Sequence, residues 1–94
     1  MFVITLRFAD KAKAPSLMDG HNAWIRRGFD EGVFLLVGSL SPNAGGVILA
    51  HNASEEEIEA RVQEDPFVAE GVVGAEILAI APGRTDGRLA FLKA

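Results

Sequence analysis

Only a few side chains in this sequence suit proton transfer near neutral pH. The chain has two histidines, His21 and His51, and no cysteine. Histidine is the side chain that most readily gains and loses a proton at this pH. It works as a base when a carboxylate accepts a hydrogen bond from one ring nitrogen, because the other nitrogen is then left to take or give a proton. The chemistry therefore depends on which carboxylate the fold places beside a histidine.

Asp65 is the strongest candidate for that carboxylate. It lies where a helix is expected to end, and a negative charge at the negative end of the helix dipole costs a few tenths to about 1 kcal/mol. Asp65-Pro66 is also a common start of a turn, so a turn role is the competing interpretation. For His21 the competing interpretation is a partly exposed helix histidine bonded to water. Together, His21 and Asp65 would form a base and the group that orients it.

Four further residues are candidates for contact with a small-molecule substrate. Ser39 could hydrogen-bond a substrate or His21, although a serine at a strand end also serves the adjoining turn. Arg7 could hold a substrate carboxylate, or it is a solvated strand cation. Trp24 and Phe67 are expected to line an apolar pocket, with a core position as the alternative for Trp24. We therefore take Ser39 as a third catalytic candidate and the other three as substrate-binding candidates.

No metal and no cofactor is expected. The two histidines are expected at opposite ends of the domain and no thiolate is available, so a zinc or iron site has no obvious ligands. Glu55, Glu56 and Glu57 are adjacent in a helix and do not face one point. Gly45-Gly46 lacks the strand-to-helix context and the following lysine of a phosphate-binding loop, so we interpret it as part of a hairpin turn.

The composition limits the classes of partner. A chain of 94 residues with 49% hydrophobic and 23% charged residues fits one domain spanning 1–94. The net charge of −4 disfavours a nucleic-acid partner. The longest apolar runs, 33–37 and 77–81, are far below the roughly 18 residues of a membrane helix. No charged leader precedes an apolar block, so the expected location is the cytoplasm.

The hydropathy pattern predicts six elements. The expected strands span residues 2–8, 33–40, 47–50 and 73–81, and the expected helices span 14–31 and 54–64. Ser54 and Glu57 form a capping box at the start of the second helix, and Pro66 ends it. The order strand, helix, strand, strand, helix, strand is that of the ferredoxin-like βαββαβ fold. This α+β fold has an antiparallel sheet in the spatial order 4-1-3-2, with both helices on one face.

Chain direction in this fold predicts where the polar residues meet. The start of the first helix, the end of the second helix and the hairpin at 41–46 all lie at one end of the domain. His21, Asp65 and Ser39 are therefore expected to be neighbours, whereas His51 is expected at the opposite end.

The uncovered sheet face predicts association. Strand 33–40 is apolar on both sides, with Val33, Leu35 and Val37 expected on one side and Phe34, Leu36 and Leu40 on the other. A bare face of that kind is larger than the apolar patch of most soluble monomers. We expect two copies to pack these faces together in a homodimer. The tail at 84–94 is expected to add a short edge strand or to cross to the partner.

The sequence resembles the YciI-like, or YCII-related, proteins over nearly its whole length to about Ala81. The resemblance depends above all on the combination of the helix histidine with the Asp-Pro-Phe motif, since either alone is unremarkable. The matching pieces are a short first strand, His21, the helix exit Glu31-Gly32, the segment Val37-Gly38-Ser39-Leu40, the motif Glu64-Asp65-Pro66-Phe67, and Gly71.

This resemblance implies a dimeric α+β barrel with an active site built on His21 and Asp65. One member of the family is a dehydrochlorinase that acts on a chlorinated aromatic compound, and the wider superfamily includes muconolactone isomerase and heme-handling monooxygenases. The chain departs from the family pattern in two ways. Ser39 stands where proline is frequent, and the basic residue that the family carries shortly before the histidine is absent from 15–20.

The first functional hypothesis is a small cofactor-independent enzyme of the lyase or isomerase type. His21 would be the general base, Asp65 would orient it, and Ser39 would steady the substrate. The alternative is a noncatalytic homodimer that binds a small ligand or acts as an accessory module, in which His21 and Asp65 only tie two helices together. A third interpretation, a heme-binding relative, would need an accessible axial ligand.

Overall fold

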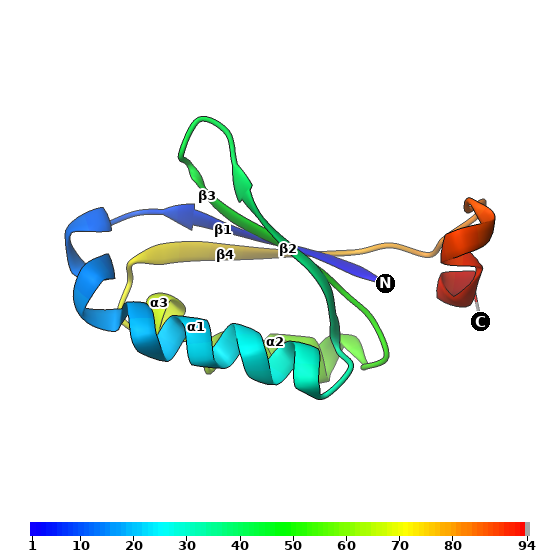
Figure 1. The fold of residues 1–94 in the computed structure, drawn as a ribbon, viewed down its shortest axis with the longest axis horizontal. Helices are drawn as coiled ribbons and strands as arrows, with labels where there is room; N and C mark the ends of the chain where they lie inside the picture. The colour runs from blue at the N-terminus through cyan, green and yellow to red at the C-terminus, as the bar shows by residue number, and fades with distance from the viewer. Residues whose placement is uncertain (94) are drawn as a thin grey trace.

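The computed structural model describes residues 1–93 and contains one antiparallel sheet in the order β2-β3-β1-β4 (Figure 1). The strands are β1 (Phe2–Phe8), β2 (Phe34–Leu40), β3 (Gly45–Ala50) and β4 (Val73–Ala79). The helices are α1 (Ala14–Asp30), α2 (Glu55–Gln63) and the short α3 (Pro66–Ala69), with 3-10 helices η1 (Lys11–Lys13) and η2 (Gly87–Lys93). Read from the other edge, the sheet order is 4-1-3-2, which confirms the ferredoxin-like α+β fold.

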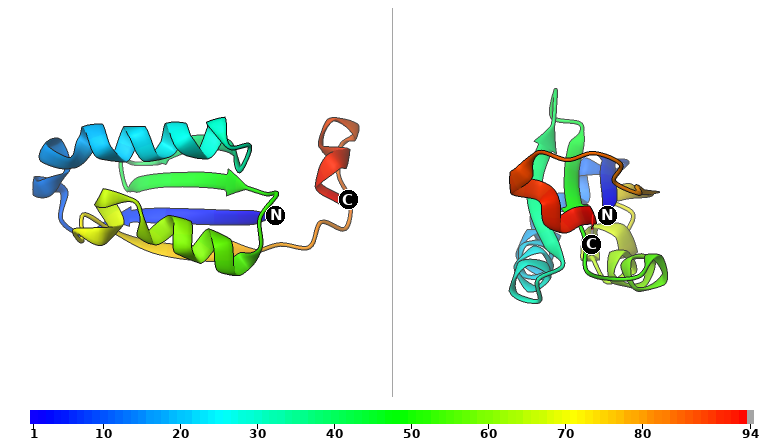
Figure 2. Two further views of the ribbon diagram at one scale, coloured as in Figure 1. Left: turned by 90° about the horizontal axis from the view of Figure 1, so that it is seen from below. Right: turned by 90° about the vertical axis from the view of Figure 1, so that its right-hand side faces the viewer.

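The core lies between the sheet and the helices, which cover one face (Figure 2). In β1, Phe2, Ile4 and Leu6 are buried and alternate with partly exposed residues. This alternation puts every second side chain on the helix side of the sheet. From α1, Trp24 is fully buried and stacks edge-on against Phe34, with ring centroids 5.2 Å apart.

The prediction for the two faces of β2 was wrong at one end of the strand. The register between β2 and β3 shifts between Phe34 and Leu36, so Phe34 and Leu36 do not share a face. An extra residue in one strand of a pair has this effect. Phe34 is buried in the core, whereas Leu36 is 47% exposed on the opposite side. Gly28 of α1 makes the close contact possible, because a Cβ atom there would overlap the Phe34 ring.

The hairpin between β2 and β3 is tighter than the sequence predicted. Gly45 and Gly46 belong to β3, so the turn consists of residues 41–44 instead of 41–46. Arg7 is the β1 partner of Gly45, and Leu6 is the partner of Gly46. Gly45 has φ +137°, and a Cβ atom at this position would overlap the backbone of Leu6. Glycine is therefore required by a close approach of two strands as well as by its backbone angle.

The segment after α2 contains an element that the sequence analysis missed. The capping box at Ser54 and Glu57 is present, and α2 ends close to the predicted position. Pro66 then begins α3, a single helical turn, instead of an irregular turn. Proline suits the first turn of a helix because its missing N–H group has no partner there in any case. The strand β4 ends at Ala79, two residues before the predicted end.

The tail does not add an edge strand to the sheet. Its residues 87–93 form the 3-10 helix η2, which Figures 1 and 2 show at the end of an extended segment, beyond the sheet. Its Phe91 ring meets the His51 ring edge-on, with centroids 5.5 Å apart. The last residue of the predicted tail, 94, lies outside the described residues. Among residues 1–93, no helix combines the length and hydropathy needed to cross a membrane.

Candidate active site

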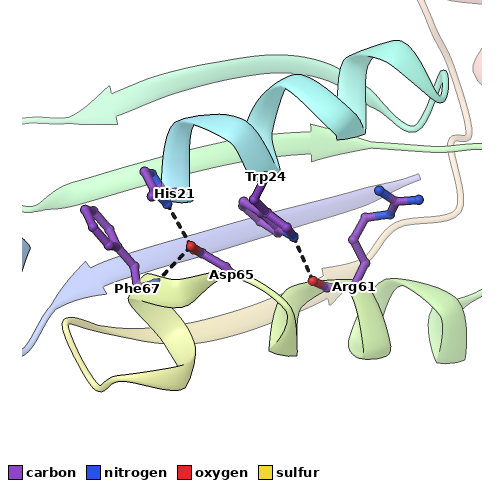
Figure 3. Close-up of polar contacts among 5 residues, drawn as sticks. All are labelled: His21, Trp24, Arg61, Asp65 and Phe67. Carbon is purple, nitrogen blue, oxygen red and sulfur yellow. Dashed lines mark hydrogen bonds and ion pairs between the residues drawn. The ribbon is translucent and has the colours of Figure 1, made fainter. Parts of the chain in front are cut away.

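His21 and Asp65 are joined by a hydrogen bond between Nδ1 of the imidazole and Oδ1 of the carboxylate, 2.8 Å apart (Figure 3). The two residues come from α1 and from the junction of α2 and α3, as the chain direction predicted. The His21 side chain is 13% exposed and the Asp65 side chain is fully buried. Since an ionised carboxylate only accepts, Nδ1 carries the proton that is donated, and in the neutral imidazole Nε2 keeps its lone pair.

Asp65 is held in place by its second role as the N-cap of α3. The same Oδ1 atom accepts a hydrogen bond from the backbone N–H of Phe67, at 3.0 Å. The turn interpretation of Asp65-Pro66 is therefore also correct, because the carboxylate caps the helix that Pro66 begins. The other carboxylate oxygen, Oδ2, is buried and has no hydrogen-bond partner among the described residues. The negative charge of Asp65 thus has few protein donors apart from His21.

Aromatic rings fix the plane of the imidazole. The Phe67 ring stacks on the His21 ring with centroids 3.9 Å apart and planes 4° from parallel. Trp24 lies on α1 one turn further along, 6.1 Å from His21 between ring centroids. Its indole N–H donates to the backbone carbonyl of Arg61, at 2.9 Å, which ties α1 to α2 (Figure 3). His21 is therefore restrained by a hydrogen bond on its edge and by stacking on its face.

A pocket of about 340 Å³ opens beside this pair, between α1 and the hairpin of β2 and β3. His21, Ser39 and Phe67 line it, in agreement with the sequence-based expectation for these three residues. Trp24 does not line it, because its side chain is fully buried in the core. Trp24 therefore has the core position that the sequence analysis gave as the alternative, and it is not part of the wall of this pocket.

Arg7 and His51 lie away from the pocket. Arg7 is exposed, and its register partner in β4 is Gly74. It alternates with the buried Leu6, so its side chain belongs to the sheet face that the helices leave open. Arg7 does not line the pocket, so its expected role of holding a substrate carboxylate there is not supported. His51 follows the end of β3 that pairs with Phe2, at the opposite end of the strand from Gly45. This position confirms that the two histidines lie far apart.

The sequence analysis missed several residues that line the pocket. Asn22 and Met18 lie on α1 near His21, and Gly38, Gly45 and Gly46 line the hairpin side. The available signal was the cluster of glycines in two adjacent strands, which have no side chains to fill the space below α1. That signal is readable only when the register of β2 and β3 is known.

The fold and the pair together define a class: a ferredoxin-like α+β domain with a histidine and a carboxylate beside an apolar pocket. The family model of the YCII-related domain matches residues 1–80. The chain therefore belongs to the YCII-related domain family. No curated protein matches the sequence.

The structure is similar to that of 5-chloro-2-hydroxyhydroquinone dehydrochlorinase (TftG) from Burkholderia phenoliruptrix AC1100, solved in complex with 2,5-dihydroxybenzoquinone. The TM-score is 0.63 at 15% sequence identity, and the match covers 88% of this chain and 96% of that chain. The neighbour shares the ferredoxin-like fold of this chain. The tail after residue 80 lies outside the matched YCII-related domain.

Proposed function

We propose that this protein is a cofactor-independent enzyme that moves a proton on a small organic substrate, with His21 as general base. The observation that carries the proposal is the 2.8 Å distance between His21 Nδ1 and Asp65 Oδ1, together with the position of His21 in the wall of the pocket. The contact engages one ring nitrogen and leaves Nε2 for the substrate. The similarity to TftG, an enzyme that acts on a small ring compound, supports the same class of function.

The step assigned to His21 is removal of a proton next to a carbonyl or enol group. The C–H bond breaks, its electron pair stays on the substrate as an enolate, and Nε2 takes the proton. The imidazolium then has Asp65 on one side and the substrate anion on the other, and both negative charges stabilise it. Returning the proton to a different carbon completes an isomerisation, and loss of a leaving group from the enolate completes an elimination. Ser39 lines the same pocket and would hydrogen-bond the substrate.

Deuterium exchange tests this step even though the natural substrate is not identified. Resorcinol and cyclohexanone are incubated with the protein in D₂O, and loss of the carbon-bound proton is followed by proton NMR. Chloride release from 5-chloro-2-hydroxyhydroquinone, the compound in the name of TftG, is measured beside it. We expect the wild-type protein to accelerate at least one reaction and His21→Ala to lose about 10²–10⁴-fold of it.

His51→Ala is the matched control, because His51 lies outside the pocket and contacts the tail. It should keep the wild-type rate. If the wild-type protein accelerates none of these reactions, or if His21→Ala is as active as the wild type, the proposal is wrong.

The capping role of Asp65 favours the second candidate function, a noncatalytic ligand-binding protein. In that case the hydrogen bond between His21 and Asp65 only ties α1 to α3. His21→Ala would then lower the melting temperature by several degrees without changing turnover or ligand affinity. The enzyme proposal expects the reverse, a lost rate with a small change in stability.

We also propose that two copies form a homodimer through the open sheet face. One row of register partners crosses all four strands on this face and is entirely apolar: Leu36, Leu49, Val3 and Leu78. Leu36 and Leu78, at the two edges, are each 47% exposed. A second copy would cover this row, because apolar surface of this extent is favourably removed from water.

Light scattering at micromolar concentration tests the dimer. The wild-type protein should have twice the chain mass of 10.0 kDa. Leu78→Glu should shift it to the monomer. Ala60→Glu should not, because Ala60 is exposed on α2, which covers the other face of the sheet. A monomeric wild-type protein would rule the dimer out.

A further inference from the structure

The pocket beside His21 is nearly free of charge. His21 is the one titratable side chain among the described residues that line it, and Asn22 and Ser39 are the other polar side chains there. The rest of the lining is apolar or glycine, including Phe8, Met18 and Phe67. A ligand in this pocket therefore exchanges water for apolar walls and a small number of hydrogen-bonding groups.

While His21 is neutral, no lining residue can neutralise an anion that the substrate brings with it. Arg7, which the sequence suggested for a substrate carboxylate, lies on the other face of the sheet. With His21 neutral, the pair with Asp65 carries a charge of −1, and with His21 protonated it carries zero. With Asp65 ionised, the pair has no net positive charge. While His21 is neutral, an anionic ligand would therefore lose its hydration without gaining a counter-ion from the residues that line the pocket.

A cationic ligand is disfavoured for a different reason. The negative charge that contacts His21, on Asp65, is fully buried, and Asp65 does not line the pocket. A ligand cation would have to give up water without direct contact with that carboxylate. The pocket therefore selects against both signs of charge.

We infer that the substrate is an uncharged, hydroxylated ring compound, such as a phenol or a cyclic enol. This inference deepens the proposed function and rests on it for the reaction, but not for the binding. A pocket of about 340 Å³ suits a molecule of one ring with small substituents. Phe8 and Phe67 provide aromatic surface for the ring, and Asn22 and Ser39 provide partners for hydroxyl groups.

The preference for a neutral substrate also agrees with the net charge of the site during proton transfer. A neutral substrate and the resting pair together carry −1, and after proton transfer the enolate, the imidazolium and Asp65 still carry −1. An anionic substrate would bring the total to −2, and no cation is among the described residues that line the pocket. Lys11 contacts Phe8 without lining the pocket, with Nζ 4.9 Å from the ring centroid. The site is thus suited to an anion that forms during the reaction beside the imidazolium, and unsuited to one that arrives from solution.

Three related compounds distinguish the effect of ligand charge on affinity from the effect of ligand size. Resorcinol is neutral, 3,5-dihydroxybenzoate is the same ring with a carboxylate, and methyl 3,5-dihydroxybenzoate restores neutrality at a larger size. Binding is measured by NMR titration of backbone amides, including those of Gly38 and Phe67 at the pocket. We expect resorcinol and the methyl ester to bind at least tenfold more tightly than the carboxylate, and to perturb the pocket amides.

A charge introduced at the pocket should reverse part of this preference. Met18 lines the pocket and is 41% exposed, so Met18→Lys can place an ammonium group at its rim without burying it. This variant should bind 3,5-dihydroxybenzoate at least tenfold more tightly than the wild type does. Leu89→Lys, with the same added charge on the tail, should leave the affinity unchanged.

Each outcome bears on one proposal. If the carboxylate binds as tightly as its ester, or if neither neutral compound binds at the pocket amides, the inferred substrate class is wrong. If the neutral compounds bind preferentially and no assay compound reacts, the substrate class stands and the enzyme proposal fails. If only a charged compound reacts, and does so in a manner that depends on His21, the enzyme proposal stands and the substrate class fails.

Discussion

Asp65 serves two purposes with one oxygen atom. Oδ1 accepts from His21 Nδ1 and from the backbone N–H of Phe67, so orientation of the imidazole and capping of α3 depend on the same carboxylate. Phe67, whose amide is capped, is also the residue that stacks on His21. The Asp-Pro-Phe motif thus supplies the hydrogen-bond acceptor, the helix start and the aromatic wall in three consecutive residues.

Substitution of Asp65 separates these two purposes. Asp65→Asn keeps a side-chain acceptor for the cap, whereas Asp65→Ala removes it and should lower the free energy of unfolding by about 1 kcal/mol more. Both variants should lose most of any activity that depends on His21, because neither retains the negative charge that stabilises the imidazolium. Urea unfolding and the exchange assay measure the two effects. Equal stability of the two variants would contradict the capping role.

At the level of strands and helices, the pocket depends on the close pairing of β3 with β1. Gly45 lies where a side chain would overlap the Leu6 backbone, and its φ of +137° is unfavourable for any other residue. The two strands can therefore approach closely beside the pocket, which Gly45 also lines.

Gly45→Ala should destabilise the protein by more than about 1 kcal/mol, because alanine fits neither the backbone angle nor the space. Gly74→Ala in β4 is the control, since no heavy atom lies within 4 Å of the added Cβ there. Thermal and urea unfolding measure both variants. A Gly45→Ala protein as stable as Gly74→Ala would show that the strands can move apart at little cost.

The start of α2 predicts a pH dependence of stability. Hydrogen bonds from the backbone N–H and the side chain of Ser54 hold the pKa of Glu57 below its usual range. A lowered pKa in the folded state means that the ionised form contributes stability above the usual glutamate pKa. This contribution is lost as the pH falls through the lowered pKa.

Glu57→Gln removes this ionisation and keeps an acceptor for the Ser54 backbone. We expect the wild type to be more stable than the variant at pH 7, and the difference to shrink as the pH falls below about 4. Urea unfolding at a series of pH values measures it. The prediction fails if the difference grows toward low pH.

For the molecule as a whole, the described part of the tail contributes no residue to the buried core. Every buried hydrophobic residue of the core lies between Phe2 and Val73 among the described residues. Within η2, Leu89 and Phe91 are each nearly half exposed. The contact of Phe91 with His51 is therefore a small part of the packing.

Removal of residues 84–94 should leave the melting temperature within about 2 °C of that of the full chain, because no core residue is lost. Circular dichroism during heating measures this, and the binding titrations with the shortened chain show whether the pocket is intact. A large loss of stability would show that the tail packs on the body or on a second copy in solution.

Local patterns in the sequence were enough for the order of the four strands with α1 and α2, and for the approach of His21 to Asp65. Alternation in β1, the capping box of α2 and the position of Pro66 are interactions between near neighbours, so they can be read along the chain. The element order then restricts the directions of the helices, and the directions bring the two residues to the same end of the sheet. This explains why a contact between residues 44 positions apart was predictable.

The shape and charge of the pocket depended on contacts that no local pattern records. The register shift in β2, the close approach at Gly45 and the positions of Trp24 and Arg7 each follow from how distant segments pack against one another. Strand register and core packing are settled by many long-range contacts at once. The residues proposed for proton transfer were thus evident from the sequence, whereas the absence of a lining cation became evident only once the described residues were placed in space.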